Sequence, residues 1–502
     1  MSEQSPFTSM PGTVTGPQRI GRPQLIPASR LGRQLKHQAV RVVRSSSPPT
    51  TALGTSTAAD EATQRHARAV CDLALRVGEA LLSTGASAAD CVATVLRLGQ
   101  AYGITSMHID ITYTSIAVSV HRGVDEDSLT VMRVIPDRSP DYTRMEAVQR
   151  HIDDIERSAE EAQAGIGTVM DVDVARTTLV SLLSSPHPYR RWVVTAGAAI
   201  MSVGVVMLYG AGPFMWMVAA FSAALVDRVQ RLLYIWGIAA FFTQVLSAAI
   251  PAGIGLVMYA IGRETPSVVV ISGIVVLLAG LSVLGAAQDA IDGYYVTAGA
   301  RGLEVMMMTL GIAVGVALVL GIARRFGVSM EAAPFVALGG TPFISTIGAA
   351  LIALGFCLST YSGVRVIGLS IVIASGAWLV LEVALFLGLA TPAAVAVAAA
   401  VVGALAFASF KVFRVPEDAI ATAGIVSLLP GLAVYRALYL IMQNNEAVVP
   451  AAVIYFVSAV ATGLGLAAGL AIGSFAARRK FGLDPAALRA RRRSRGTYVA
   501  DA

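Results

Sequence analysis

Charged residues are scarce in this sequence, and the scarcity is uneven. The chain has 502 residues, of which 14% are charged and 55% are hydrophobic, whereas a soluble domain carries about 25% charged residues. The deficit is concentrated after Trp192, where long apolar runs follow one another, and the residues before it have ordinary polar composition. This pattern excludes a soluble enzyme and indicates a chain that folds partly in water and partly in lipid.

Cysteine, histidine and nucleotide-binding motifs are also scarce or missing. The three cysteines (Cys71, Cys91 and Cys357) are far apart and match no metal-site spacing, so we expect neither a disulfide framework nor a metal site. All six histidines precede residue 190, which excludes a histidine proton relay in the apolar part and leaves carboxylates for any proton coupling. The sequence has no P-loop, so drive by ATP is not expected, nor is a cofactor.

The N-terminal residues lack a continuous apolar stretch, which excludes a secretory signal peptide. Residues 1–60 are rich in Ser, Thr, Pro, Gly and Arg and predict a disordered cytosolic tail. Residues 61–188 have the patterning of a small cytosolic α+β domain.

The order of elements in this domain follows from its periodicity. Apolar residues at helical spacing predict a helix over about 70–81, Gly85 ends it, and Ser87 can cap a second helix that runs to about Tyr102. Alternating apolar residues then predict strands, with a change of parity at Thr114-Ser115 that indicates a bulge or turn. The expected strands cover 109–113, 116–120 and 129–135, with a turn over 123–127 and an acidic helix over about 142–164.

Ten apolar segments follow, most of them close to the roughly 20 residues that a spanning helix needs. We divide them into two five-helix halves, 189–325 and 326–476, followed by a basic cytosolic tail over 477–502. The segments are 192–210, 213–226, 234–261, 267–288, 303–322, 335–359, 365–388, 391–410, 419–442 and 450–475.

Basic residues predict the orientation of these spans. With a cytosolic N-terminus, eleven Lys or Arg residues lie at inside-facing ends and loops and three at outside-facing ones, as the positive-inside rule requires. Both termini are then cytosolic, in the plasma membrane. The net charge of +6 therefore indicates topology rather than nucleic-acid binding, and the run Arg489–Arg495 is more simply a topology anchor than a lipid-recognition site.

A sequence repeat links the two halves. Residues 273–283 (GIVVLLAGLSV) recur as residues 424–434 (GIVSLLPGLAV), with eight of eleven positions identical at an offset of 151 residues. The copies fall in the fourth and ninth segments, so they cross the membrane in opposite directions. The sequence therefore predicts a 5+5 inverted repeat, an arrangement found in secondary transporters.

The repeat also marks a place where the spans can break. Gly280 and Gly431 are matched glycines within the two copies, and Pro430 lacks a backbone donor. Such positions interrupt helices and expose backbone groups that can bind substrate. Close helix packing explains the glycines equally well.

Charged residues in the membrane part are further candidates, because a charge at mid-helix costs about 2.5–3.5 kcal/mol on insertion scales. Glu382 is the most internal acid and Arg436 the most internal base. A polar cluster follows the first repeat copy and indicates either a cytosolic gate or an ordinary charged loop; its members are Asp289, Asp292, Arg301 and Glu304.

A hydrolase is the enzymatic alternative. The soluble domain contains Ser, His and Asp residues that could form a catalytic triad, namely His108, Asp110, Ser115, Ser119, His121 and Asp125. The sequence has no G-x-S-x-G motif, and strand residues two apart simply share a face. A regulatory or gating role for the domain is the better interpretation.

Several of these stretches together resemble one family. They are Leu81-Leu-Ser-Thr-Gly-Ala86 running into residues 109–120, Met132-Arg-Val134, Leu277-Leu-Ala-Gly280, the residues Asp289, Asp292-Gly293, Gly299, Arg301-Gly302 and Glu304, and Leu428-Leu-Pro-Gly431. Over about residues 65–475 the sequence is similar to the threonine/serine exporter family. The family often has Pro-Gly in the first copy, where this chain has Ala279.

The resemblance implies a cytosolic N-terminal domain, ten spans and a proton-driven exporter of small hydroxylated amino acids. Its expected partners are the amino acid, protons and the lipid bilayer, and a homo-oligomer stays open. The alternative within the same resemblance is export of another small metabolite, such as a dicarboxylate.

Overall fold

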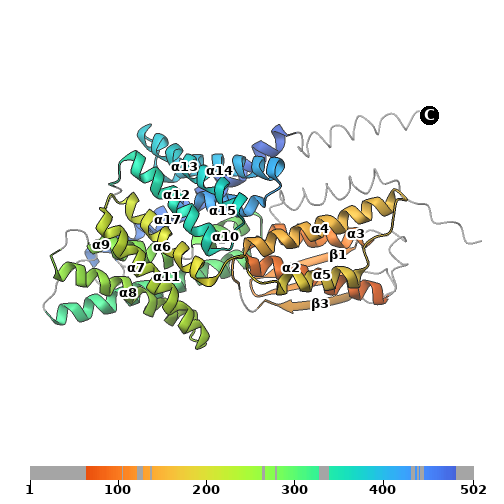
Figure 1. The fold of residues 1–502 in the computed structure, drawn as a ribbon, viewed down its shortest axis with the longest axis horizontal. Coiled ribbons are helices and arrows are strands. Elements are labelled where there is room, and N and C mark those ends of the chain that lie inside the picture. The colour runs from red at the N-terminus through yellow and green to blue at the C-terminus, as the bar shows by residue number, and fades with distance from the viewer. Residues whose placement is uncertain are drawn as a thin grey trace, which may run out of the picture.

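The computed structural model has two parts, a soluble domain and a larger bundle of apolar helices, arranged along the long axis of the molecule (Figure 1). It describes residues 64–481 except 105, 121–127, 136–137, 263–265, 278–279 and 327–338; between 431 and 445 only Ala433, Arg436, Ala437 and Leu440 are described. The predicted tail 1–60, turn 123–127, Gly431 and basic run 489–495 lie outside the described residues.

The soluble domain contains the elements that its periodicity predicts, and one more. Ser87 caps the second helix by accepting from the backbone N–H of Asp90, as predicted. The change of strand parity is a two-residue turn at Tyr113 and Thr114. The elements are α2 (Gln64–Thr84), α3 (Ala88–Ala101), β1 (Met107–Thr112), β2 (Ser115–Val120), β3 (Leu129–Val134), α4 (Tyr142–Gln163) and α5 (Val172–Ser184), the last not predicted.

The sheet has the order β1-β2-β3 and is antiparallel. Its register pairs Ile109 with Val118 and Ile111 with Ile116, so their buried side chains share one face. This face packs on α2, whose Gly78 lies against Ile116. The domain therefore has its own apolar core beneath the sheet.

The second part of the chain is almost entirely helical. Seven helices are long and apolar enough to span a membrane, and the bent pair α9/α10 would be an eighth. The helices are α6 (Arg191–Leu208), α7 (Pro213–Ile235), α8 (Ala240–Ala260), α9 (Pro266–Leu277), α10 (Gly280–Ile291), α11 (Tyr295–Arg325), α12 (Pro342–Ser359), α13 (Val364–Phe386), α14 (Thr391–Phe413), α15 (Glu417–Ile425), the short 3₁₀ helices η1 (Val426–Leu428) and η2 (Glu446–Val448), and α17 (Val449–Lys480).

The sequence predicts ten spans, and the described residues contain eight when the bent pair α9/α10 is counted as one span. Two of the predicted segments account for this difference. The predicted short segment 213–226 is the start of α7, which continues to Ile235 through Asp227, Arg228 and Arg231 and is thus too charged to count. The ninth segment is interrupted after η1 and enters residues that are not described. The chain is therefore a multi-pass helical membrane protein with seven or eight candidate spans in its described residues.

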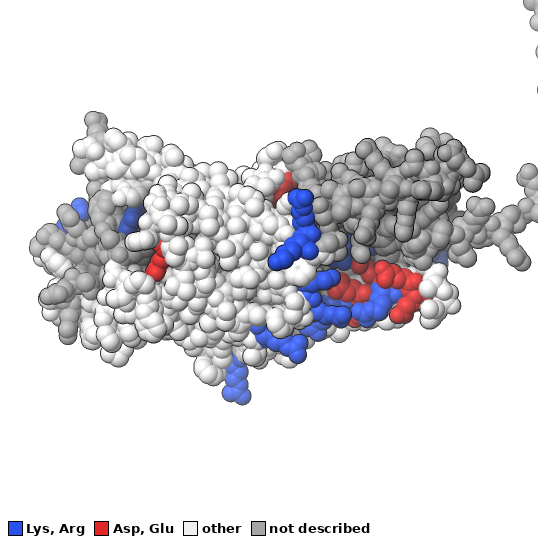
Figure 2. Space-filling view, turned by 90° about the horizontal axis from the view of Figure 1, so that it is seen from above, with Lys and Arg blue, Asp and Glu red and all other residues white. Residues whose placement is uncertain are grey.

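The surface of the helical part is apolar. Large exposed side chains include Phe343, Val364 and Phe386, the last 91% exposed. In Figure 2 the charged residues of the visible face gather mainly over the soluble domain and its border with the helices. A broad uncharged belt of this kind suits contact with lipid.

Two helices pack against each other through glycines in a reciprocal manner. A Cβ atom on Gly197 of α6 would lie 2.7 Å from the carbonyl oxygen of Gly355 of α12, and one on Gly355 would collide with the carbonyl of Gly197. Gly204 and Gly348 approach each other in the same way, at 2.5 and 2.8 Å. Because the pairing runs 197 with 355 and 204 with 348, α6 and α12 are antiparallel.

Glycines also bring two other helix pairs together. On α11, Gly311 and Gly315 face carbonyl groups of α8, and on α17, Gly465 and Gly469 face carbonyl groups of α14. Small residues at a four-residue spacing allow helix backbones to approach closely in membranes. The contacts are Gly311 with Phe241, Gly315 with Val245, Gly465 with Pro392 and Gly469 with Ala396.

Candidate functional site

The turn between α10 and α11 brings a buried ion pair together. The turn closes through Gly293, with φ of +89°, and the backbone N–H of Tyr294 donates to the carbonyl of Asp289 over 2.7 Å. An Arg301 Nη1 atom then lies 3.3 Å from an oxygen of the Asp289 carboxylate, with 9% and 0% of the two side chains exposed. Gly285 makes room for the guanidinium, since a Cβ atom there would collide with it.

The soluble domain completes the surroundings of this pair. The backbone N–H of Ala88, in the first turn of α3, donates to Asp289 Oδ1 over 3.3 Å. The Thr297 hydroxyl donates to the carbonyl of Ile111 at the end of β1, over 3.0 Å. Because the N-terminus of a helix favours a negative charge, α3 and Arg301 both stabilise the Asp289 carboxylate, from opposite domains.

Glu304 binds the same domain one helical turn further along α11. Tyr113, in the turn between β1 and β2, faces Glu304, and burial together with the nearby Glu304 carboxylate raises the pKa of Tyr113 to about 12. The Arg138 guanidinium lies 4.2 Å above the Tyr113 ring and also donates to the Tyr113 carbonyl. Burial and the nearby Arg301 charge lower the pKa of Arg138.

Acidic residues face each other on the other side of the turn. Burial raises the pKa of Asp292 to about 7, and the charges of Asp90 and Asp289 contribute to the increase. Asp90 belongs to the first turn of α3. The junction between the soluble domain and the helices therefore has a carboxyl group that changes its charge near neutral pH.

We use the name junction cluster for Asp289, Asp292, Arg301 and Glu304 together with Ala88, Asp90, Ile111, Tyr113 and Arg138. The structure brings together the four residues that the sequence grouped as a polar cluster, and it places them against the soluble domain. The partners from the soluble domain were not predicted. Ala88 and Ile111 contribute backbone groups, which leave no signal in the sequence.

The first repeat copy contains a bend. The helices over Val268–Leu277 and Ser282–Ile291 meet at 49°, and Gly280 lies between them at the start of α10. In the second copy α15 gives way to η1, and Leu429 is extended, directly before the buried Pro430. Both copies thus depart from a straight α-helix within the repeated sequence.

Glu382 and Arg436 have surroundings of their own. The indole N–H of Trp378, one turn earlier on α13, donates to Glu382 over 2.7 Å. Glu382 lies 18 residues after Val364, which corresponds to about 27 Å along the helix from the end of α13 that contacts the soluble domain. Arg436 lies over the Tyr455 ring, with its guanidinium carbon 5.8 Å from the centroid.

The serine hydroxyls of the candidate triad are both hydrogen-bonded to threonine hydroxyls of the sheet. Ser115 hydrogen-bonds to Thr112 over 2.6 Å, and Ser119 to Thr130 over 2.7 Å. His108 is paired with Ser119 across the sheet, while Asp110 is exposed. His121 and Asp125 lie outside the described residues.

The soluble domain docks through buried polar contacts on one end of a multi-pass helical bundle, and the bundle contains interrupted helices. This architecture is that of a membrane transport protein. Comparison with known proteins supports this class. Residues 72–323 match the family described as "Putative threonine/serine exporter", and residues 345–476 match "Threonine/Serine exporter, ThrE". The chain belongs to the threonine/serine exporter family.

Two relatives are similar to most of the chain. A "Probable threonine/serine exporter" of Mycobacterium tuberculosis is 35% identical over 419 residues, which cover 82% of this chain and 77% of the relative. A "Threonine/serine exporter" of Corynebacterium glutamicum is 31% identical over 421 residues, or 82% and 83% of the two chains. No solved structure matches the chain. Membership in a family of exporters favours transport over hydrolysis.

Proposed function

We propose that this protein exports threonine and serine across the plasma membrane as a secondary-active transporter. The names of the two relatives support the substrates, and the architecture of the helices supports the mode of transport. The observation that carries the mode is a set of helix contacts that occurs once in each half of the helical part, with most of the contacting residues related by one sequence offset.

The offset is 151 residues, the same as that of the sequence repeat. It relates Gly197 and Gly204 on α6 to Gly348 and Gly355 on α12. It also relates Phe241 and Val245, whose carbonyl groups on α8 face glycines of α11, to Pro392 and Ala396, whose carbonyl groups on α14 face glycines of α17. The glycines of these contacts, Gly311 and Gly315 against Gly465 and Gly469, are 154 residues apart. Gly273, which lies against Pro251, corresponds in the same way to Gly424, which lies against Val402.

These contacts support two halves with one internal architecture, 189–325 and 326–476. The equivalent helices α6 and α12 are antiparallel neighbours whose glycines contact each other reciprocally, which is the contact expected across a two-fold axis in the membrane plane. Such halves can exchange conformations, and the exchange would turn a cavity from the cytosol to the outside. Ten spans in a 5+5 inverted repeat remain our proposal for the whole chain.

The interruptions in the repeat copies are the proposed substrate site. Helix ends near Gly280 and Pro430 expose backbone N–H and C=O groups, which suit the carboxylate and ammonium of an amino acid. A site that also hydrogen-bonds the side-chain hydroxyl would reject valine, because its methyl group leaves those polar groups unpaired. Gly431 and Arg436 are further candidates, and we expect Gly280 and Gly431 to lie near each other at the bilayer midplane.

We propose protons as the coupling ion, and the soluble domain as a cytosolic gate over the junction cluster. Asp289, Asp292, Glu304 and Glu382 are the candidate proton carriers, since the described membrane helices have no histidine. With both termini in the cytosol, the ends of α10, α11 and α12 that contact the soluble domain face inward. Opening the cytosolic side would then require the soluble domain to move.

The test of the proposed function is efflux from cells loaded with a threonine dipeptide that is hydrolysed inside. We expect cells with the protein to export threonine faster than cells without it, and dissipation of the proton gradient to abolish export against a threonine gradient. Equal efflux with and without the protein would overturn the proposal. Efflux of a dicarboxylate in place of threonine would support the alternative substrate.

A further inference from the structure

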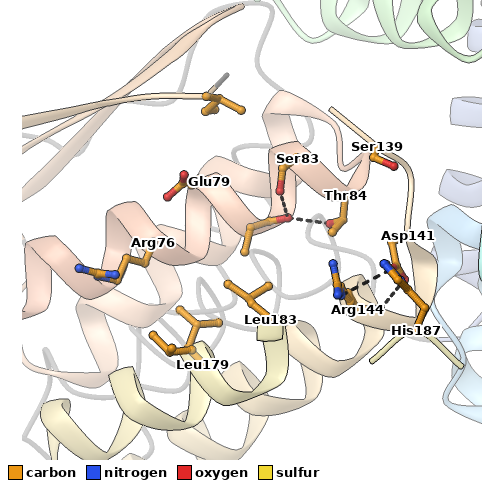
Figure 3. A pocket seen from close by; sticks show the side chains of 13 residues that line it. Arg76, Glu79, Ser83, Thr84, Ser139, Asp141, Arg144, Leu179, Leu183 and His187 are labelled. Carbon is orange, nitrogen blue, oxygen red and sulfur yellow. Dashed lines mark hydrogen bonds and ion pairs between the residues drawn. The ribbon is translucent and has the colours of Figure 1, made fainter. Parts of the chain in front are cut away.

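A cavity of about 480 Å³ lies in the soluble domain and is lined by none of the residues of the junction cluster. It is bounded by the C-terminal part of α2 from Arg76 to Thr84, the first turn of α4, one side of α5 and the segment that leads into α6 (Figure 3). Leu179, Val180 and Leu183 of α5 give it an apolar wall together with Ala80 and Ile135, and the other residues that line it are polar or charged. An apolar cavity with a few convergent polar groups is the usual form of a small-molecule site.

One end of the cavity presents hydrogen-bond donors. Arg144 lines it, and its Nε atom is buried without a hydrogen-bond partner in the described part of the chain, although Asp141 lies 3.6 Å away. The same end is the N-terminus of α4, where Asp141 is the cap. A buried guanidinium N–H beside the positive end of a helix favours a carboxylate.

The acceptor end of the cavity lies directly beside the donor end, because the backbone N–H of Asp141 donates to the carbonyl of Thr84 over 3.3 Å (Figure 3). The hydroxyls of Ser83 and Thr84 both donate to the carbonyl of Ala80, over 3.0 and 2.7 Å. Their hydrogens are therefore used within α2, and only oxygen lone pairs are left for a ligand. This end is also the C-terminus of α2, whose partial negative charge favours a cation.

The charges that line the cavity balance each other. Arg76 is paired with Asp72 over 2.8 Å, Glu79 with Arg133 over 2.7 Å, and Asp141 with Arg144 over 3.6 Å. The Nδ1 atom of His187 also lies 2.9 Å from the Asp141 carboxylate. A ligand with a net charge would therefore find no uncompensated partner, whereas a molecule with both charges would match the donor end and the acceptor end. Its apolar or hydroxylated side chain would lie over Leu179 and Leu183.

We propose that this cavity is a regulatory site for a free α-amino acid, separate from the transport path. The choice of an amino acid as the ligand class rests on the proposed function. The amino acid that the protein exports would bind this cytosolic cavity as well, so that occupancy of the cavity would follow its cytosolic concentration. The carboxylate would accept from Arg144, and the ammonium would donate to Ser83 and Thr84.

The cavity is connected to the membrane helices by direct contacts. His187, which lines it, stacks on Tyr361 in the turn between α12 and α13, with ring centroids 4.3 Å apart. The backbone N–H of Tyr142 donates to Thr360 over 3.1 Å, and the Tyr189 hydroxyl donates to Ser362 over 2.9 Å. A ligand that orders Arg144 and His187 would thus change how the soluble domain holds this turn.

The test is amide hydrogen exchange of the full chain in detergent, with and without threonine. Occupancy at ten times the dissociation constant should slow exchange in segments 139–145 and 179–187 by roughly tenfold, where opening requires release of the ligand. Threonine amide, which lacks the carboxylate, and 3-hydroxybutyrate, which lacks the ammonium, should give no protection. Unchanged exchange in these segments with saturating threonine would overturn the proposal.

A matched pair of variants locates the site. Ser83→Leu fills the cavity and should abolish the protection, whereas Ser181→Leu should keep it, because Ser181 is an exposed α5 residue that makes the same kind of bond to its own helix, to Thr178. Protection that persists in Ser83→Leu would place binding elsewhere and contradict the proposal. Threonine export without protection of these segments would refute the regulatory site alone; protection without export would refute the exporter alone.

Discussion

At the scale of single residues, Asp292 is the group whose charge should matter near neutral pH. Its pKa is raised to about 7 by burial and by the charges of Asp90 and Asp289, so the folded protein holds a proton that the unfolded chain releases above about pH 4. The contribution of Asp292 to stability therefore falls as the pH rises from about 4 to about 7 and is constant above that.

We expect Asp292→Asn to remove this dependence. The thermal midpoint of the variant, relative to that of the wild type, should increase between pH 5 and pH 7 and then level off. Scanning calorimetry or fluorescence at pH 5, 6, 7 and 8 measures this difference. A difference that is constant over the whole range would show that Asp292 is ionised throughout.

The Asp289–Arg301 pair gives a second prediction at this scale. Arg301→Gln leaves a fully buried carboxylate without its cation, which costs about 3–5 kcal/mol for a buried pair. Arg157→Gln, which breaks an ion pair with Asp154 whose side chains are 61% and 54% exposed, should cost less than about 1 kcal/mol.

The double variant Asp289→Asn/Arg301→Gln should recover part of the loss, because the stranded charge is then gone. Urea unfolding of Asp289→Asn, Arg301→Gln and the double variant, each compared with the wild type, gives the coupling energy between the two side chains. Losses of equal size in Arg301→Gln and Arg157→Gln would contradict the burial of the pair.

At the scale of helices, close packing at glycines is testable on a single helix. A Cβ atom on Gly315 of α11 would collide with the carbonyl of Val245, whereas Gly321 of the same helix has open space around it. Gly315→Ala should therefore destabilise the bundle, while Gly321→Ala should be neutral or stabilise it by up to about 1 kcal/mol, since alanine is the better helix former.

Thermal unfolding in detergent, together with threonine export, compares the two variants. The α8–α11 contact corresponds to the α14–α17 contact, so Gly469→Ala should behave like Gly315→Ala. Tolerance of alanine at both positions would refute close packing as the role of these glycines.

Much of the local structure could be predicted, because it depends on periodicity and caps. Ser87 caps α3, and the parity change at Thr114 is a hairpin turn, as the sequence indicates. Helix α5 was missed although Asp171 caps it, because exposed Val174 and Val180 blur its pattern.

Longer-range features were harder to predict. The apolar segment 213–226 ends just before Asp227, whereas α7 continues through Asp227 to Ile235. Arg191 and Thr195 of α6 both donate to the Asp227 carboxylate, over 2.8 and 2.7 Å, and so offset the cost of its burial. The polar cluster at 289–304 could be predicted as a group, but its partners in the soluble domain could not, since contacts to backbone groups leave no mark on the sequence.

At the scale of the whole molecule, the proposed topology places the soluble domain and the turn between α13 and α14 on opposite sides of the membrane. All three native cysteines are buried, so single cysteines can report topology without their removal. Trp236→Cys and Ile166→Cys should react with an impermeant maleimide only in inside-out vesicles, and Ala390→Cys only in intact cells. Labelling of Trp236→Cys and Ala390→Cys from one side would refute the orientation.

The central claim is that this chain alone moves hydroxylated amino acids across a membrane. The most direct measurement is release of labelled threonine from liposomes that contain only the purified protein, with a proton gradient imposed across the bilayer. We predict saturable release of threonine and serine, none of valine, and faster release with the gradient than without it. Threonine release no faster than from protein-free liposomes, with or without the gradient, would contradict the account.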